Sequence, residues 1–438
     1  MTTPDLAQAI ARGPVPIDGG LSNALERAGA DLSGDLWSAR LLRDDPEAIA
    51  AAHAAYFEAG ARVAITASYQ TSFEGFAAHG VGPDEAAALM RRSVSLAREA
   101  ARRGGLEGAA WVAASVGPYG AVLAGGEEYT GAYAALGWPG RTQGGLTVAE
   151  LRAFHRPRID ALLAASPDLL ALETIPAGAE AEALLLEVAD VGVPAWLSLT
   201  TVTAPDGSVR TRLGEDAAEV FAMAADVDSV LAVGVNCTDP VGAAAAIRVA
   251  ARAPGKPVVV YPNSGGTWLA AERRWAGSPR FSPEVVESWV GLGARLIGGC
   301  CQVGREAIAE IAVTLEGMGF RYGVRVLECG PGAPLASKGD CEGLIADAFG
   351  SRAGLVVIPV DRLDARFFDL RTGVAGEVLQ TLVNYRLRVV VVGPVPGRAP
   401  SAALQDFMRE SNRGRQVWFV ADDAELDARL AATAAATA

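Results

Sequence analysis

Residues 296–301 read Leu-Ile-Gly-Gly-Cys-Cys, a short apolar run followed by two glycines and two adjacent thiols, Cys300 and Cys301. Glycine lets the backbone turn sharply and come close to a ligand. Cys237 stands in a similar context, directly after the run Val-Gly-Val-Asn at 233–236. Two strand ends that bring three thiols together would form a site for a soft metal, most simply zinc with one open coordination position. The alternative is that these cysteines are small core hydrophobes.

Eight strand-like runs alternate with helical segments up to about residue 320. The runs span 15–18, 62–68, 110–116, 168–174, 195–200, 229–236, 257–262 and 294–299. Most are almost continuously apolar, which is typical of parallel strands buried on both faces. Helices are predicted between them, for example over 84–103, 148–165, 177–189, 216–225, 241–252, 283–292 and 305–317. This count predicts an α/β fold, a (β/α)8 TIM barrel, whereas a doubly wound sheet more often has fewer strands.

Active-site groups of a (β/α)8 barrel lie at the carboxyl ends of its strands. Polar side chains follow most of the predicted strands at that end. They include Asp18, Tyr69, Glu173, Asn236, Cys237, Asn263, Cys300 and Cys301. The three thiols would therefore share one face with two carboxylates, and this convergence favours a metal site over three unrelated core cysteines.

Eight short motifs occur in a fixed order along the first 320 residues. They are Asp-Gly-Gly (18–20), Ile-Thr-Ala-Ser-Tyr-Gln (65–70), Gly-Pro-Tyr-Gly-Ala (117–121), Glu-Tyr-Thr-Gly (128–131), Leu-Glu-Thr-Ile-Pro (172–176), Gly-Val-Asn-Cys-Thr (234–238), Tyr-Pro-Asn-Ser-Gly (261–265) and Gly-Gly-Cys-Cys (298–301). Together they resemble the homocysteine S-methyltransferases, above all the bacterial enzymes that take the methyl group from S-methylmethionine or S-adenosylmethionine. The likeness covers about residues 10–320. Ala67-Ser68 departs from it, because many relatives have Thr-Asn there.

The resemblance implies a (β/α)8 barrel with Zn²⁺ as cofactor and Cys237, Cys300 and Cys301 as its ligands. It also points to Glu173 as the anchor of the homocysteine ammonium group, with Asp18 supporting the same group or the loop around it. Each carboxylate has a structural alternative, since Glu173 could cap a helix and Asp18-Gly19-Gly20 is also a good turn. Asn236 precedes a ligand and is interpreted as a residue that orients it, or else as a satisfied amide at a strand end.

The chemistry implied by this resemblance is direct methyl transfer to a thiolate. A free thiol has a pKa near 8.5 and is mostly protonated at neutral pH, whereas the thiolate is the nucleophile. Zinc binds and deprotonates such a sulfur. Three cysteinates give the centre a formal charge of about −1, which leaves the substrate sulfur electron-rich and does not repel a sulfonium donor. No catalytic residue beyond the zinc centre is required, and the products are methionine and a thioether.

The methyl donor needs a pocket that accepts a cation, and aromatic faces suit cations. The candidates for that pocket are Tyr69, Tyr119, Tyr129, Trp268 and Trp275. The glycine-rich stretch 123–131 and the segment 265–278 are long enough to cover the site, as barrel loops do. The three histidines show no ligand spacing and are interpreted as structural or surface residues; they are His53, His79 and His155.

The last hundred or so residues form a fresh α/β pattern, so the predicted domains are 1–322 and 323–438. Strands are predicted over 324–329, 354–359, 387–392 and 416–421, and helices over 341–349, 373–385 and 401–409. This part resembles a small bacterial domain with no assigned function. Its Cys329 and Cys341 are not expected to bind zinc, and the alanine-rich end from 431 is expected to fray.

Composition excludes several other classes of protein. The net charge of −13 argues against nucleic acid or an anionic membrane as partner. No apolar run is long enough to span a membrane, and the N-terminus has no secretory signal. Five cysteines without an export signal indicate a reducing cytoplasm and argue against a disulfide framework. We expect a monomer or small homo-oligomer whose partners are homocysteine and a sulfonium donor in methionine biosynthesis.

Two other functions remain open from the sequence. The same scaffold could methylate another thiol or a selenol, such as selenohomocysteine. Alternatively the chain could be a non-catalytic zinc-binding regulatory protein in which the C-terminal domain acts; Glu173 beside three thiols argues against this, because a structural zinc needs no amino-acid anchor. A methylcobalamin- or folate-linked enzyme would need further domains.

Overall fold

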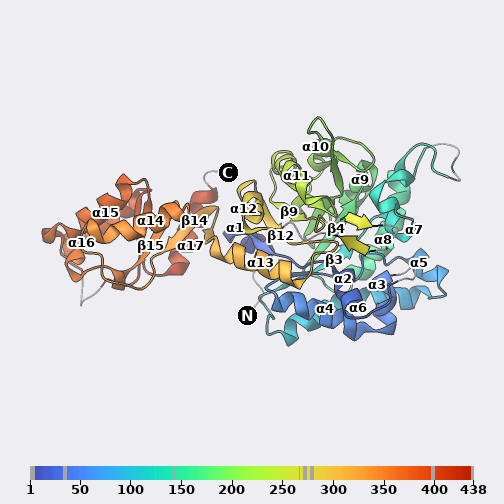
Figure 1. Cartoon of the computed structure of the whole chain (residues 1–438), viewed down its shortest axis with the longest axis horizontal. Coiled ribbons are helices and arrows are strands. Elements are labelled where there is room, and N and C mark those ends of the chain that lie inside the picture. Colours follow the sequence, from blue (N-terminus) through green and yellow to red (C-terminus); the bar gives the residue numbers. More distant parts are fainter. Residues whose placement is uncertain are drawn as a thin grey trace. The chain divides into compact units, whose positions relative to one another are not determined.

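The computed structural model describes residues 5–32, 37–123, 125–139, 141, 144–265, 267–269, 274–276, 281–395 and 400–435. The chain divides into two compact units (Figure 1). One comprises residues 1–10 and 14–314, and the other comprises residues 11–13 and 315–438. Each unit has its own sheet and its own hydrophobic core.

The larger unit is a barrel of eight parallel strands. In spatial order they are β1 (Val15–Pro16), β12 (Ala294–Ile297), β9 (Val258–Tyr261), β8 (Val230–Asn236), β5 (Ala195–Leu199), β4 (Leu169–Ile175), β3 (Trp111–Val116) and β2 (Val63–Ile65). A parallel bridge between Ile17 and Val63 joins the two edge strands. The Arg62 amide donates to the Pro16 carbonyl at 2.8 Å on the same seam. This closure confirms the predicted (β/α)8 barrel and excludes an open doubly wound sheet.

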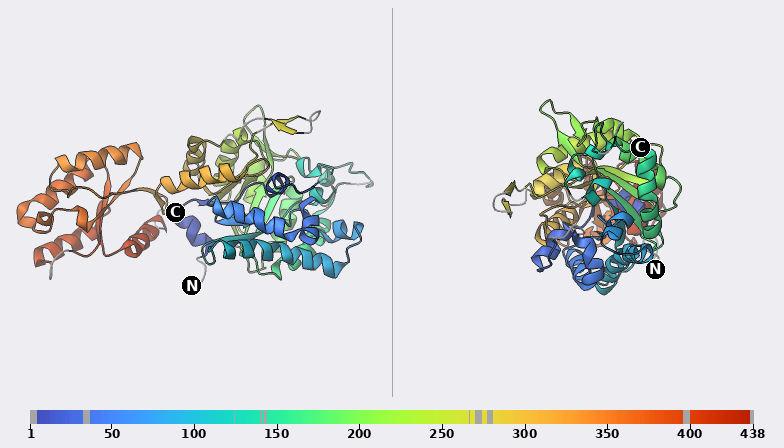
Figure 2. Two further views of the ribbon diagram at one scale, coloured as in Figure 1. Left: turned by 60° about the horizontal axis from the view of Figure 1, so that its bottom comes forward. Right: turned by 90° about the vertical axis from the view of Figure 1, so that its right-hand side faces the viewer.

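Helices surround the barrel strands (Figure 2). They are α1 (Leu6–Arg12), α2 (Leu21–Arg27), α3 (Trp37–Asp44), α4 (Pro46–Glu58), α5 (Phe73–Ala78), α6 (Pro83–Arg103), α7 (Tyr119–Leu123), α8 (Val148–Leu163), α9 (Gly178–Val188), α10 (Ala217–Ala222), α11 (Pro240–Arg252), α12 (Pro283–Gly291) and α13 (Arg305–Gly317). Local sequence sets their starts. Thr147 and Glu150 form a capping box at the start of α8, and Asp45 caps α4 ahead of Pro46. All seven predicted helices are present, with ends that shift by a few residues.

Two antiparallel hairpins interrupt the barrel pattern and were not predicted. One is β6 (Thr201–Thr203) with β7 (Val209–Thr211), which follows β5. The other is β10 (Thr267–Leu269) with β11 (Arg274–Ala276), which follows β9. The second hairpin lies in the segment 265–278 that we expected to cover the site, and most of the remaining residues of that segment lie outside the described residues.

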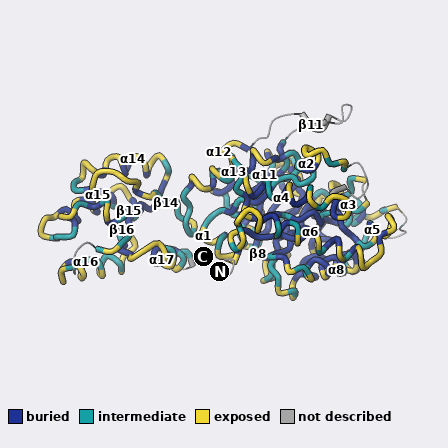
Figure 3. Tube along the Cα trace, turned by 90° about the horizontal axis from the view of Figure 1, so that it is seen from below, coloured by how far each residue is buried: buried dark blue, intermediate teal, exposed yellow. Residues whose placement is uncertain are grey.

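Buried side chains from all eight strands pack together inside the barrel, so its interior is a core. Figure 3 colours the buried residues of the chain dark blue. Trp196 on β5 and Tyr261 on β9 are both buried. The Trp196 indole nitrogen donates to the Tyr261 hydroxyl at 3.1 Å, and the two rings meet edge to face. This contact holds Tyr261 at the carboxyl end of its strand, where the candidate site begins.

His53 on α4 makes the stability of the barrel depend on pH. Its side chain is fully buried, and neither ring nitrogen has a hydrogen-bond partner among the described residues. Burial lowers the pKa of His53 from 6.5 to about 4. Between these two values the unfolded chain binds a proton that the folded barrel excludes. The free energy of unfolding therefore falls as pH drops from 6.5 toward 4, by up to about 3 kcal/mol from this residue.

Replacement of His53 with leucine tests this dependence. Above pH 6.5 His53 is neutral in both the folded and the unfolded wild type, so its protonation does not reduce the free energy of unfolding. As the pH falls below 6.5, the free energy of unfolding of the wild type should decrease relative to that of His53→Leu. Urea titrations at about pH 7.5 and about pH 5 measure the change. His79→Leu, at an exposed histidine whose Nδ1 lies 3.0 Å from the Gly75 carbonyl oxygen, is the matched control. A stability difference between wild type and His53→Leu that is the same at both pH values contradicts the prediction.

The smaller unit contains a five-stranded sheet. The order is β13 (Phe320–Arg321), β14 (Val324–Glu328), β15 (Leu355–Pro359), β16 (Arg388–Val392) and β17 (Val417–Val420), with β13 antiparallel and the others parallel. Its helices are α14 (Glu342–Gly350), α15 (Val374–Asn384), α16 (Ala402–Arg413) and α17 (Asp423–Ala435). The four predicted strands and three predicted helices are present. Residues 431–435, the described part of the end that was expected to fray, continue α17, and Leu426 and Leu430 pack the preceding turns of this helix in a buried cluster with sheet residues.

No helix in the described part of the chain combines the length and apolarity needed to cross a membrane.

Candidate active site

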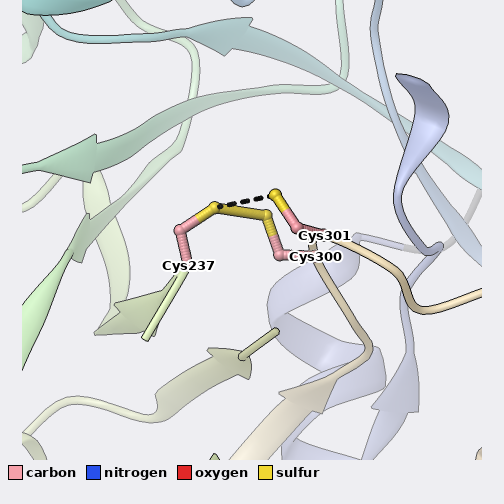
Figure 4. A group of neighbouring side chains, drawn as sticks. All are labelled: Cys237, Cys300 and Cys301. Atoms are coloured by element: carbon pink, nitrogen blue, oxygen red, sulfur yellow. Dashed lines mark hydrogen bonds between the residues drawn. A yellow bond between two sulfur atoms is a disulfide. The ribbon is translucent and has the colours of Figure 1, made fainter. Parts of the chain in front are cut away.

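Three cysteines gather at the carboxyl end of the barrel (Figure 4). Cys237 follows β8, while Cys300 and Cys301 follow β12. Their Sγ atoms all lie within 4.8 Å of one another. Hydrogen bonds to the end of β9 and the residues after it fix both turns. The Cys237 amide donates to the Tyr261 carbonyl at 3.4 Å, the Cys300 amide donates to the Pro262 carbonyl at 2.8 Å, and the Cys301 amide donates to the side-chain Oδ1 of Asn263 at 3.2 Å. The structure therefore brings the three predicted thiols together.

Cys237 and Cys300 form a disulfide, although the cysteine count argued against a disulfide framework. Strands β8 and β12 bring their Cα atoms to 5.6 Å, which is within the range that a disulfide spans. Cys301 is free, and its Sγ lies 3.9 Å from that of Cys237. The argument from cysteine count and missing export signal did not consider the pair that the barrel brings together across 63 positions.

The chemistry of the donor set fits zinc once the disulfide is reduced. Sulfur atoms bound to one tetrahedral zinc at about 2.3 Å lie roughly 3.8 Å apart, close to the 3.9 Å between Cys237 and Cys301. Thiolates, not a disulfide, are metal ligands, so Cys237 and Cys300 can both join Cys301 in the set only after reduction. Cys329 and Cys341 are buried in the smaller unit, and among the described residues neither belongs to a group that could hold a metal ion.

Glu173 and Asp18 are two buried carboxylates at the same end of the barrel. Glu173 lies near the end of β4, accepts a hydrogen bond from the Ser115 hydroxyl and has Tyr261 as a second hydrogen-bond partner. Burial raises its pKa to about 7. Asp18 Oδ2 accepts from the Ile65 amide at 2.8 Å, whereas Oδ1 is buried with no partner among the described residues. Burial raises the pKa of Asp18 well above its usual range, and the nearby charge of Glu173 raises it further.

These two carboxylates have no cationic partner within the described part of the chain. No described Arg, Lys or His forms an ion pair with Glu173 or Asp18. Burying an unpaired carboxylate is costly, and a cation placed between the two groups would remove that cost. Glu173 lines the cavity, whereas Asp18 does not, although the next two residues, Gly19 and Gly20, do. This end of the cavity is therefore suited to an ammonium group.

Asn236 lies behind the cavity wall. Its Oδ1 accepts from the Thr174 amide at 2.7 Å and from the Ser198 hydroxyl at 2.8 Å, and its Nδ2 donates to the Thr174 hydroxyl at 2.7 Å. Thr174 has a left-handed backbone, φ 61°, which a β-branched residue rarely adopts. Asn236 holds this strained residue directly after Glu173, so the structure places it as a support of the β4 end and not in the cavity lining.

The predicted aromatic residues separate into two groups. Tyr69 and Tyr129 line the cavity, and the Tyr129 hydroxyl lies 4.0 Å from Cys301 Sγ. Tyr119 instead packs against Tyr133 and Phe154, away from the cavity lining. The side chains of two further candidates lie outside the described residues; these are Trp268 and Trp275.

Two buried charged residues behind this wall, Arg158 and Glu180, were missed. Arg158 on α8 donates to the carbonyls of Gly117 at 2.9 Å and Tyr69 at 3.0 Å. Glu180 on α9 accepts from the Tyr119 amide at 2.7 Å and is 2.8 Å from His155 Nε2. These side chains hold the loops after β2 and β3 from the outer helices. The available signal was their place on the apolar face of each helix, where a charged residue is unusual.

The cavity itself has a volume of about 1140 Å³. The three cysteines, Glu173 and Tyr69 line it together with Glu128, which sequence reasoning had not singled out. Residues of α2 and of the stretch that follows it, including Glu26 and Asp31, line it as well. The space is large enough for two small molecules, one beside the sulfur atoms and one further along the wall.

Comparisons with known proteins divide the chain at the same place as its two units. The family model described as homocysteine S-methyltransferase matches residues 16–315, and a domain of unknown function, DUF4180, matches residues 321–430. The chain is 43% identical to homocysteine S-methyltransferase 4 of Zea mays over 319 residues, which is 69% of this chain and 89% of that protein. It is 40% identical to homocysteine S-methyltransferase YbgG of Bacillus subtilis (strain 168) over 314 residues, 68% of this chain and 93% of that one.

Solved structures show the same likeness. The metallated form of the homocysteine methyltransferase MmuM from Escherichia coli superposes with a TM-score of 0.59 at 37% identity, over 69% of this chain and 96% of that one. The oxidised form of the same protein gives a TM-score of 0.59 at 38% identity, over 68% of this chain and 95% of that one.

Proposed function

The chain belongs to the homocysteine S-methyltransferase family, and we propose that it converts homocysteine to methionine in a zinc-dependent methyl transfer from a sulfonium donor. The carbon–sulfur bond of the donor breaks, its electron pair stays with the leaving thioether, and a new carbon–sulfur bond forms on the homocysteine thiolate. With S-methylmethionine the thioether is a second methionine. The observation that supports this proposal is the cluster of three sulfur atoms beside two buried, cation-free carboxylates.

Cys237, Cys300 and Cys301 are the residues that would hold the metal. When bound, zinc would keep the acceptor sulfur as a thiolate at neutral pH, and three cysteinates would leave the centre formally anionic and compatible with a cationic donor. Only the reduced protein can offer three thiolates. We therefore place the protein in the reducing cytoplasm, as a monomer or small homo-oligomer.

Glu173 and Asp18 would bind the homocysteine ammonium group. An ammonium group placed there would satisfy the unpartnered Oδ1 of Asp18 and favour the ionised form of Glu173. Asn236 would act indirectly, by holding Thr174 and the end of β4. Tyr69 would form part of the wall beside the substrate. These residues bind and align, and no general base is needed once the acceptor is a thiolate.

The test is methionine formation by reduced, zinc-loaded protein supplied with homocysteine and either S-methylmethionine or S-adenosylmethionine. Turnover with either donor supports the proposal and ranks the two. Absence of turnover with both, from protein that holds about one zinc per chain, contradicts it and directs the search to other thiol or selenol acceptors.

We further propose that residues 1–322 carry the whole activity and that 323–438 form a separate domain. A protein that ends at residue 322 keeps every described residue of the cavity lining and all of α13. We expect its kcat/KM for homocysteine to stay within about threefold of the full chain, because compact domains with their own cores usually function independently. Matched assays at equal zinc content measure this. A loss of activity by a zinc-loaded, folded truncation would assign the C-terminal part a role in catalysis.

A further inference from the structure

Glu128 is a further buried carboxylate in the cavity wall, separate from Glu173. It lies on the short 3-10 helix η1 (Glu127–Tyr129), lines the cavity and is only 9% exposed. Its Oε2 atom is buried with no hydrogen-bond partner among the described residues. No described Arg, Lys or His forms an ion pair with it. A buried carboxylate oxygen without a partner destabilises the fold unless a ligand supplies a hydrogen bond or a positive charge.

The backbone around Glu128 is fixed tightly. Gly126 and Gly131 flank η1 with left-handed φ values of 89° and 65°. A Cβ atom on Gly120 would lie 2.6 Å from the Glu128 amide nitrogen, so only glycine allows the loop to pack this closely on α7. The sequence of this loop therefore directs one carboxylate toward the cavity, while the neighbouring Glu127 is used locally and accepts from the Gly125 amide at 3.0 Å.

Two aromatic residues lie in the cavity wall with Glu128, and one of them reaches the sulfur cluster. Tyr129 follows Glu128 directly, with its hydroxyl 4.0 Å from Cys301 Sγ, and Tyr69 lines the same cavity. Glu128, Glu173 and Cys301 line the same cavity, although the two carboxylates come from different strand ends. Arg212, which is not part of the described cavity lining, lies with its guanidinium 5.8 Å from the centroid of the Tyr129 ring. It donates to the Thr200 hydroxyl at 3.1 Å and to the Cys237 carbonyl at 3.4 Å, so it forms no ion pair with Glu128.

We propose that Glu128, with the rings of Tyr69 and Tyr129, forms the subsite for the positively charged sulfur of the methyl donor. This assignment rests on the function proposed above and adds to it the recognition of the donor. A sulfonium has no proton to donate, so it is recognised by charge and by aromatic faces, not by hydrogen bonds. The pair of carboxylates Glu173 and Asp18 remains available to bind the homocysteine ammonium group.

The charge balance of the reaction gives this subsite a further consequence. The donor enters as a cation and leaves as a neutral thioether, since the sulfur keeps the electron pair of the broken bond. A carboxylate at this place therefore binds the cationic donor more tightly than the neutral thioether that the reaction leaves behind. Because the donor's charge diminishes as the methyl group moves, Glu128 contributes more to donor binding than to the chemical step.

The test compares Glu128→Gln with Glu127→Gln, which removes the same charge one residue away. At saturating homocysteine, Glu128→Gln should raise the donor KM at least about tenfold with kcat, homocysteine KM and zinc content nearly unchanged. Glu127→Gln should leave all four values close to wild type. An unchanged donor KM in Glu128→Gln, or a fall in kcat alone, overturns the assignment.

Equilibrium binding gives a readout that does not need turnover. The ratio of Kd values for methionine and S-methylmethionine isolates the sulfonium charge, because the two ligands share the amino-acid part. Wild type should prefer S-methylmethionine, Glu128→Gln should lose that preference, and Glu128→Asp should recover part of it. Wild type that turns over neither donor would contradict the proposed function, while a preference retained in Glu128→Gln would contradict this inference alone.

Discussion

Replacing Cys301 with alanine should remove zinc and methyl transfer together while the barrel stays folded. Cys301 contributes one of three sulfur atoms that lie within 4.8 Å of one another. Loss of a residue that merely orients a metal ligand typically costs ten- to a hundredfold in affinity or activity, so loss of a ligand should cost at least about a hundredfold. Cys301 is the free cysteine of the three, so the substitution leaves the Cys237–Cys300 pair intact.

Zinc per chain after dialysis in reductant, methionine formation and circular dichroism together measure this result. The matched control is Cys341→Ala, which removes a buried thiol from the smaller unit and should change neither zinc content nor turnover. A Cys301→Ala protein with full zinc and full turnover would show that the assignment of the metal site is wrong.

Replacing Glu173 with glutamine should weaken homocysteine binding strongly and leave zinc in place. Glu173 is buried and has no cationic partner among the described residues. Truncating one partner of a buried, hydrogen-bonded charge pair costs about 2–5 kcal/mol, which corresponds to roughly thirtyfold to several thousandfold in kcat/KM for homocysteine. Glu26→Gln, at an exposed carboxylate of the same cavity, is the control and should stay within about twofold.

The pH dependence of this effect separates Glu173 from the metal ligands. Glu173 has its pKa raised to about 7 by burial, so it is protonated below and ionised above this value in the free enzyme. Only the ionised form attracts an ammonium group, so the wild-type KM for homocysteine should fall as pH rises through 7. In Glu173→Gln this component is absent. A variant with the same pH profile as wild type would assign the dependence to another group.

The barrel was predictable because its signals are local. Each strand is a short apolar run, and most of these runs end in polar residues, so the strand count alone predicts that Glu173 and the three cysteines share one face of the barrel. The grouping of Cys237 with Cys300 and Cys301 follows from barrel topology, and the positions of the three sulfur atoms confirm it.

The missed features depend on packing between distant segments. The disulfide needed the distance between β8 and β12, which no local pattern encodes. Arg158 and Glu180 act on loops that are far away in the sequence, so their function is visible only once α8 and α9 are placed. Glu128 belongs to one of the eight motifs, but its buried and unpartnered oxygen is a property of the folded loop. The helix α17 was hidden by its alanine-rich composition.

The hydrogen-bonded series Trp196, Tyr261 and Glu173 connects the middle of the barrel to its mouth. The Tyr261 hydroxyl accepts a hydrogen bond from the core residue Trp196 and is also hydrogen-bonded to Glu173, the proposed ammonium anchor. Selection for a stable interior and selection for amino-acid affinity therefore act on the same hydroxyl group. Substitutions at the core position Trp196 are thus constrained by ligand recognition as well as by volume, and a repacked core that ignores this bond would be stable yet poorly matched to its substrate.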